Sequence, residues 1–187
     1  MSSASIHTSS VDATVACGAA LGALVAPRDV MVLCGDLGAG KTHLSKGLAV
    51  GLGVTQPVTS PTFNILLVHM GRVPLYHFDL YRLESADQLV DIDYFETVES
   101  DGVAVVEWGD RFAEVMQSCT LVVDIRITDD DARELRVDAR DSRGDELLSR
   151  WLDAVSGLDG VRCHVADGAG AITRLPVDEQ RAAGDAL

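Results

Sequence analysis

The chain has 187 residues, enough for one α/β domain with a complete core and too few for two ordinary domains. Its formal net charge of −14 disfavours direct binding to nucleic acid or to an anionic membrane, because both require clustered Lys and Arg. The four cysteines stand far apart without a Cys-x-x-Cys pair, which argues against a zinc site or a disulfide framework and fits a reduced cytoplasm.

The N-terminal part of the chain predicts a tail followed by a helix. Residues 1–9 are small and polar, and we expect them to be disordered. A helix is predicted over residues 11–25, capped by one of the two serines before it and ending ahead of Pro27. The uncharged stretch 15–27 is shorter than the about 20 residues of a membrane span, so no membrane helix is expected.

A phosphate-binding loop follows. The apolar run 30–34 predicts a buried strand, and leucines at helical spacing predict a helix that ends before Gly53. Between them, residues 35–42 read Gly-Asp-Leu-Gly-Ala-Gly-Lys-Thr, which fits the pattern G-x-x-x-x-G-K-[ST]. The glycines let backbone N–H groups converge on phosphates at the helix N-terminus. Lys41 is expected to reach the β- and γ-phosphates, and the Thr42 hydroxyl to bind Mg²⁺.

The next segments predict a loop, a hairpin and a short helix. Two prolines forbid helix in the hydroxyl-rich segment 56–63, which predicts an ordered loop. The apolar or alternating runs 65–68 and 75–80 predict a hairpin of two strands. A serine and a glutamine at capping-box spacing predict a short helix over residues 86–91.

The last part of the chain predicts a buried strand, a second hairpin and a helix. The run 103–106 is apolar throughout, and residues 121–127 and 135–139 alternate between apolar and polar side chains across an acidic turn. A helical stripe of apolar residues follows over residues 147–155.

This order of elements predicts an α/β protein with a P-loop NTPase-like three-layer fold, whose mixed, mostly parallel central sheet carries antiparallel hairpins. We expect one P-loop ATPase domain over residues 10–157. The flanking segments are predicted to be a disordered N-terminus, residues 1–9, and a mobile C-terminal tail, residues 158–187, because neither has hydrophobic periodicity.

Two carboxylates are candidates for chemistry beside the loop. Asp79 and Glu107 each end an apolar strand, and the carboxyl ends of strands meet at the edge from which the phosphate loop departs. A strand-end carboxylate is by default solvated, but here we favour a functional role for both. The hydroxyl-rich residues 59–62 are interpreted either as a switch that senses the γ-phosphate or as a rigid connector. His77 is interpreted as a packing or strand-face histidine and not as a base, and the His43 side chain is expected to point away from the phosphates.

Four sequence blocks resemble the signature blocks of the TsaE (YjeE) family in order and spacing: residues 35–42, Thr-Ser-Pro-Thr-Phe at 59–63, Tyr-His-Phe-Asp-Leu-Tyr-Arg-Leu at 76–83 and Val-Glu-Trp at 106–108. The resemblance covers about residues 8–155. It implies an ATPase that supports formation of N6-threonylcarbamoyladenosine at position 37 of tRNAs that read codons beginning with A.

The resemblance also implies site residues. Thr42 and Glu107 would hold Mg²⁺, and Asp79 would position water or contact the nucleotide. The catalytic residues would then be Lys41, Asp79 and Glu107. The ATP-binding residues would be Asp36, Leu37, Gly38, Ala39, Gly40, Lys41, Thr42, His43, Thr62, Asp79 and Trp108. Three departures from the usual family pattern are His43 in place of a second threonine, Gly109 in place of a proline, and a tail beyond Leu158 that has no family counterpart.

The implied partners are TsaD-like and TsaB-like proteins in the cytoplasm, with tRNA reached only indirectly through them and no membrane involved. The TsaD-like protein would transfer the threonylcarbamoyl group, while ATP turnover, weak in the isolated chain and stimulated by partners, would reset the complex. Two alternatives remain: a small-molecule P-loop kinase, for which we find no Arg-bearing lid between Glu107 and Leu121, and a nucleotide-controlled binding module whose slow hydrolysis times its association with a partner.

Overall fold

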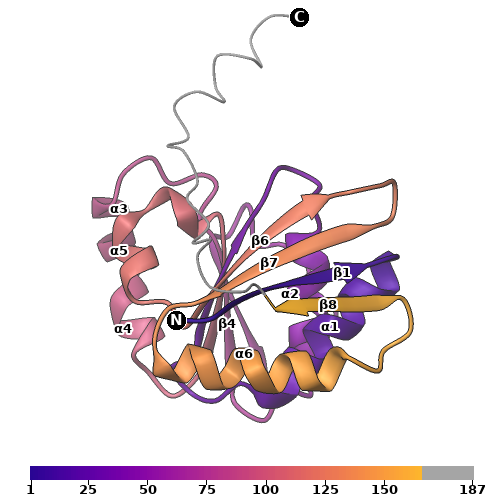
Figure 1. Cartoon of the computed structure of the whole chain (residues 1–187). Coiled ribbons are helices and arrows are strands. Elements are labelled where there is room, and N and C mark those ends of the chain that lie inside the picture. Colours follow the sequence, from indigo (N-terminus) through magenta and orange to yellow (C-terminus); the bar gives the residue numbers. More distant parts are fainter. Residues whose placement is uncertain (166–187) are drawn as a thin grey trace, which may run out of the picture.

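The computed structural model describes residues 1–165 and shows an α/β fold built on one eight-stranded sheet (Figure 1). The strands are β1 (Ser3–Thr8), β2 (Val30–Cys34), β3 (Leu66–Met70), β4 (Pro74–Asp79), β5 (Val103–Glu107), β6 (Leu121–Ile127), β7 (Arg133–Ala139) and β8 (Val161–Val165). They lie in the order β3-β4-β5-β2-β6-β7-β1-β8. The central strands β4, β5, β2 and β6 are parallel neighbours, and the remaining pairs are antiparallel.

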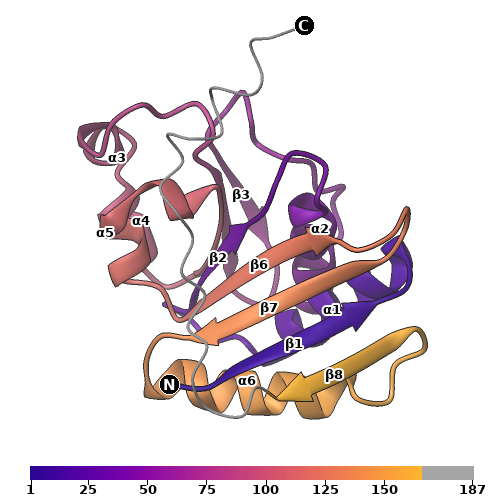
Figure 2. The ribbon, with the colours of Figure 1, turned by 45° about the horizontal axis from the view of Figure 1, so that its top comes forward.

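Helices cover both faces of the sheet. They are α1 (Val11–Leu24), α2 (Lys41–Gly51), α3 (Asp87–Asp91), α4 (Tyr94–Val98), α5 (Ala113–Gln117) and α6 (Ser142–Val155), with a 3₁₀ turn η1 at Gly109–Arg111. The helices α1, α2 and α6 pack on one face with a large hydrophobic cluster, and α3, α4 and α5 pack on the other with a smaller one (Figure 2). The predicted α/β class, the three layers and the mixed sheet with antiparallel hairpins are confirmed.

The prediction that residues 1–9 are disordered is wrong. Ser3–Thr8 forms β1, which pairs with β7 on one side and with β8 on the other. Its side chains alternate, with Ala4 and Ile6 buried and Ser5 and His7 half-buried. The strand is stabilised by ladder hydrogen bonds on both edges, whereas its own sequence is too short and too rich in serine to give a strand signal.

The predicted mobile tail is also wrong in its first part. Val161–Val165 forms β8, which lies antiparallel to β1. This strand depends on β1 as its partner, so a prediction that leaves residues 1–9 disordered cannot also predict β8. Residues 166–187 lie outside the described part of the chain.

The other predicted elements agree closely with the structure. The helix α1 is capped by Ser10, whose side chain accepts a hydrogen bond from the backbone of Ala13 at 3.0 Å, and it ends one residue earlier than predicted. The two predicted hairpins are β3–β4 and β6–β7. The sequence pattern does not predict α4, α5 or η1, because elements of three to five residues are too short to display a period.

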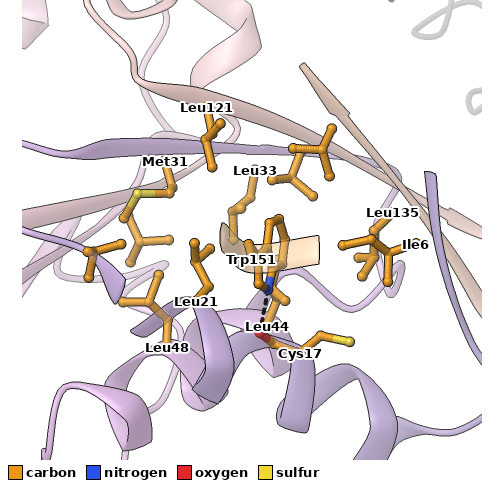
Figure 3. Close-up of a cluster of buried hydrophobic side chains, with 14 of the residues drawn as sticks. Ile6, Cys17, Leu21, Met31, Leu33, Leu44, Leu48, Leu121, Leu135 and Trp151 are labelled. Carbon is orange, nitrogen blue, oxygen red and sulfur yellow. Dashed lines mark hydrogen bonds between the residues drawn. The ribbon is translucent and has the colours of Figure 1, made fainter. Parts of the chain in front are cut away.

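The phosphate-loop helix is fixed to the rest of the protein by unusually close packing against α1. Figure 3 shows the hydrophobic core between these helices and the sheet, in which the Trp151 Nε1 group donates a hydrogen bond to the carbonyl of Cys17 at 2.9 Å. Two glycines on each helix face the other helix: Gly18, Gly22, Gly47 and Gly51. This contact lets the backbones approach each other and holds α2 in place under the loop.

We expect Gly47→Ala to lower the free energy of unfolding by about 1–3 kcal/mol, because the added Cβ would lie 2.0 Å from the carbonyl oxygen of Val15. Alanine normally stabilises a helix interior by about 1 kcal/mol relative to glycine. Helix propensity alone would therefore predict an increase in the free energy of unfolding, whereas we expect a decrease. Urea denaturation checks this, with Gly157→Ala as a control, since a Cβ at Gly157 meets no atom within 4 Å. A Gly47→Ala protein as stable as the wild type would contradict the close packing.

Candidate nucleotide site

The phosphate loop connects β2 to α2, as the sequence predicts. Gly38 and Gly40 have φ angles of 79° and 113°, in the left-handed region that favours glycine. The helix α2 begins at Lys41, directly after Gly40. The backbone N–H groups of the loop therefore lie at a helix N-terminus, where an anion is stabilised by the partial positive charge of the helix.

Lys41 is buried at the entrance of the loop. Its ammonium group donates hydrogen bonds to the carbonyls of Gly35 at 2.7 Å and Asp36 at 2.9 Å. It also lies 3.8 Å from the centre of the Trp108 ring, and the backbone of Trp108 has a φ of 63°, which is uncommon for a residue with a side chain. The loop carbonyls therefore hold the Lys41 charge next to the position that the pattern assigns to phosphates.

A cavity of about 310 Å³ opens at this point. It is lined by Leu37, Gly38, Gly40, Lys41, Thr42, His43, Ser60, Thr62, Asp79, Tyr81, Glu107 and Trp108. Most of the sequence-predicted site residues thus meet in one place. Asp36 takes part through its carbonyl, whereas Ala39 is buried beneath the loop and its carbonyl accepts a hydrogen bond from Arg133 Nε at 2.8 Å.

Glu107 is held next to the first turn of α2. It ends β5, is 2 % exposed, and its Oε2 atom accepts a hydrogen bond from the Thr42 hydroxyl at 3.1 Å. Within residues 1–165, no group of three or more His, Cys, Asp or Glu side chains is arranged to hold a metal by itself. A threonine hydroxyl and one carboxylate nevertheless fit Mg²⁺, which prefers oxygen ligands and takes the rest from phosphates and water.

Asp79 holds the hydroxyl-rich loop. It ends β4, directly opposite Glu107 in the parallel ladder, and is also buried. Its Oδ2 atom accepts hydrogen bonds from the hydroxyls of Ser60 at 2.7 Å and Thr62 at 2.6 Å, and its Oδ1 atom accepts one from the Tyr81 backbone at 3.1 Å. The predicted loop is therefore tied to the edge of the cavity by its side chains.

Sequence reasoning missed three residues around the cavity. His77, which the sequence predicts to be a packing or strand-face histidine, is fully buried, but its Nε2 atom lies 2.9 Å from Glu107 Oε1. The Ser45 hydroxyl lies 3.3 Å from the same oxygen. Strand alternation, which places His77 on the same face as Asp79, was a usable signal. No sequence signal pointed to Arg133, because this residue comes from a hairpin that is distant in the sequence.

Arg133 also borders a second cavity, of about 420 Å³, beside the phosphate loop. Its lining comes from both ends of the described chain and from the β6–β7 hairpin: His7, Thr8, Ser9, Thr128, Ala132, Arg133, Gly160, Val161 and Arg162. The sequence could not predict this cavity, because its walls are brought together only by the pairing of β7, β1 and β8.

A phosphate loop between a strand and a helix, facing two carboxylates at the ends of neighbouring parallel strands, defines a P-loop nucleotide-binding protein. The sequence model of the family described as "Threonylcarbamoyl adenosine biosynthesis protein TsaE" matches residues 8–136, and the chain belongs to this family. The resemblance of the four sequence blocks is thereby confirmed.

Individual proteins support the same conclusion. The chain is 45 % identical over 120 residues to the tRNA threonylcarbamoyladenosine biosynthesis protein TsaE of Treponema pallidum, covering 64 % of this chain and 89 % of that protein. It is 42 % identical over 126 residues to the Bacillus subtilis protein of the same name, covering 67 % and 78 %. The crystal structure of Bacillus subtilis YdiB superposes with a TM-score of 0.67 at 33 % identity, covering 82 % of this chain and 97 % of YdiB.

None of the helices within residues 1–165 has the length and apolar character needed to span a membrane.

Binding of Mg-ATP is expected to change the fluorescence of Trp108, because the Lys41 charge lies over its ring and Tyr81 packs at 5.2 Å from it. Titration of the full chain with Mg-ATP measures this change. Trp151 is fully buried and should contribute a constant background, so the change should vanish in Trp108→Phe. Binding seen by calorimetry without any spectral change would contradict the expected coupling.

Proposed function

We propose that the chain binds and hydrolyses Mg-ATP in support of threonylcarbamoyl transfer to adenosine 37 of tRNAs that read codons beginning with A. The observation that carries this proposal is the placement of Asp79 and Glu107, opposite each other in the parallel ladder and lining the cavity at the phosphate loop. Family membership gives the pathway, and this acidic pair supports turnover of the nucleotide in addition to its binding.

The residues around the first cavity can bind the β- and γ-phosphates, the metal and the attacking water. The loop N–H groups and Lys41 bind the β- and γ-phosphates, and Thr42 and Glu107 hold the metal. When bound, Mg²⁺ neutralises charge on the phosphate oxygens. Asp79 faces the same cavity from the next strand, and we propose that it positions the attacking water and accepts its proton. The water oxygen would bond to the γ-phosphorus while the bond from that phosphorus to the β–γ bridging oxygen breaks, so that ADP and inorganic phosphate leave.

The second cavity suits the nucleoside. A phosphate loop binds phosphates only, so the base and ribose need an adjoining space. The cavity bordered by Arg133 provides it, since the Arg133 guanidinium contacts the loop through the Ala39 carbonyl. We therefore propose that the nucleoside binds on the β7–β1 side of the loop and the γ-phosphate on the side of Asp79 and Glu107.

The partners are proposed to be TsaD-like and TsaB-like proteins that hold the tRNA. A chain with a net charge of −14 is repelled by a phosphate backbone, so contact with tRNA is expected to be indirect. The segment between β5 and β6 forms η1 and α5, whose residues Phe112 and Val115 are buried against the sheet. The one arginine of this segment, Arg111, donates hydrogen bonds to the carbonyls of Leu80 and Tyr81, which disfavours the mobile Arg-bearing lid that a small-molecule kinase uses.

Depletion of the protein in its own cell is expected to leave adenosine 37 unmodified in the relevant tRNAs, measured by mass spectrometry of tRNA nucleosides. A wild-type copy should restore the modification, whereas Lys41→Ala or Glu107→Ala copies should not. Normal modification after complete depletion would contradict the proposal. ATP turnover measured with and without the two partners separates an ATPase from a binding module that hydrolyses ATP only slowly.

A further inference from the structure

We propose that His77 is a positioning residue that orients Glu107 for the metal of the nucleotide site. This inference rests on the proposed function, because it assigns a role within the same Mg-ATP site. It starts from the hydrogen bonds that Glu107 accepts: His77 Nε2 at 2.9 Å and Ser45 Oγ at 3.3 Å on Oε1, and Thr42 Oγ1 at 3.1 Å on Oε2. Both partners of Oε1 are buried, with His77 fully enclosed.

The three contacts give the two oxygens of the Glu107 carboxylate different surroundings. Oε1 is anchored from inside the protein, by a strand residue and a residue of the second turn of α2. Oε2 lies next to Thr42, which lines the cavity. Mg²⁺ requires a nearly ideal octahedral arrangement, so a carboxylate with one oxygen fixed and the other presented is a better ligand than one that is free to rotate.

The fold explains how His77 reaches this position. In the β4–β5 ladder, Asp79 is opposite Glu107 and His77 is opposite Val105, two residues earlier. Side chains two residues apart lie on the same face of a sheet, so His77 is the diagonal neighbour of Glu107 on the face that α2 covers. The strand that supplies Asp79 thus also supplies the anchor of Glu107.

The other ring nitrogen of His77 argues against a purely structural role. An ionised carboxylate only accepts, so the bonded Nε2 atom carries the hydrogen and Nδ1 is left as an acceptor. Nδ1 is buried and has no hydrogen-bond partner within residues 1–165. A buried polar atom without a partner costs stability, so an apolar residue of similar size would serve packing at least as well.

The neighbouring His69 provides a matched comparison. It is buried on β3, its ring centre lies 6.2 Å from that of His77, and its Nε2 atom is likewise without a partner in the described part of the chain. Burial lowers the pKa of His69, and the proximity of His77 lowers it further. Among the described residues His69 makes no hydrogen bond to Glu107, so it shares the burial of His77 without its contact to the site.

The test measures how strongly Mg²⁺ favours nucleotide binding. For the full chain, the affinity for a non-hydrolysable ATP analogue is determined by calorimetry with Mg²⁺ and with EDTA, and the ratio of the two is compared among variants. Because the metal binds the free nucleotide equally in every experiment, a change in this ratio reports the metal affinity of the protein–nucleotide complex. The readout does not depend on hydrolysis.

For His77→Leu we expect the ratio to fall about 10- to 100-fold, the usual effect of losing a hydrogen-bond partner of a metal ligand. His77→Gln should recover most of the ratio, because its amide N–H reaches the position of Nε2. His77→Asn should not recover the ratio, because its amide reaches only the position of Nδ1. If His77→Leu does not fold, the comparison of His77→Gln with His77→Asn still tests the positioning role. His69→Leu should keep the wild-type ratio.

Three results would overturn the positioning role: a wild-type ratio in folded His77→Leu, equal ratios in His77→Gln and His77→Asn, or the same loss in His69→Leu. Failure of the proposed function would be seen differently. It would appear in the wild-type chain itself, as an absence of nucleotide binding or as binding that does not respond to Mg²⁺.

Discussion

Replacement of Lys41 by alanine is expected to reduce ATP turnover by about 10²- to 10³-fold, the usual cost of removing one preorganised charge or donor from a reacting group. The ammonium group is held by the carbonyls of Gly35 and Asp36 and lies over Trp108, all at the mouth of the loop. Its loss removes the charge that faces the phosphates, while the sheet and both hydrophobic clusters stay complete.

The measurement is phosphate release in the presence of the TsaD-like and TsaB-like partners, with circular dichroism to verify folding. Lys46→Ala is the matched control, because it removes a lysine from the same helix at a position that does not line the cavity. A folded Lys41→Ala protein that hydrolyses ATP at the normal rate would show that the phosphate loop has been wrongly assigned.

The part of the fold that the sequence could predict is the part specified by local patterns. The loop at residues 35–42 combines fixed glycines, a lysine and a threonine with a strand before and a helix after it, and the structure has this arrangement. The alternation in β6 and β7 likewise defines their hairpin. In each case the pattern arises from the element itself, so no distant contact is needed to recognise it.

The part that could not be predicted depends on distant partners. The strand β1 contains four residues of Ser, Thr or His among six, and it is ordered because β7 and β8 pair with both of its edges. Val161–Val165 has the same dependence on β1. The wall of the second cavity and the contact of Arg133 with the loop follow from this pairing, so neither could be predicted from local sequence patterns.

The candidate site shows the same division. Asp79 and Glu107 were recognisable because each ends an apolar strand, and the parallel register brings them together. The residues that orient them were recognisable only in part. The hydroxyl-rich segment that contains Ser60 and Thr62 stands out in the sequence, but its hydrogen bonds to Asp79 do not, and the contacts of His77 and Ser45 with Glu107 were not predicted. A motif records the residue that meets the ligand, whereas the residues behind it are set by packing across elements.

These different surroundings indicate different tasks for the two carboxylates. Glu107 accepts a hydrogen bond from Thr42 and is therefore proposed to bind the metal. Asp79 accepts hydrogen bonds from the hydroxyls of Ser60 and Thr62 and is proposed to position the attacking water. Asp79→Asn is expected to lower kcat by about 10²- to 10⁴-fold, the range for loss of a general base, with little change in the affinity for an ATP analogue.

The comparison with Glu107→Gln makes this expectation specific. Both changes keep the size of the side chain and remove its charge, and both residues are 2 % exposed at the ends of neighbouring strands, so their effects on folding should be similar. Loss of metal affinity should appear in Glu107→Gln, and loss of turnover at saturating Mg-ATP in Asp79→Asn. Calorimetry with Mg²⁺ and single-turnover hydrolysis with the partners present measure the two quantities separately. If Asp79→Asn loses the Mg²⁺ dependence and Glu107→Gln retains it, the two roles are exchanged, and Asp79, with the hydroxyl-rich loop that it holds, is the metal ligand.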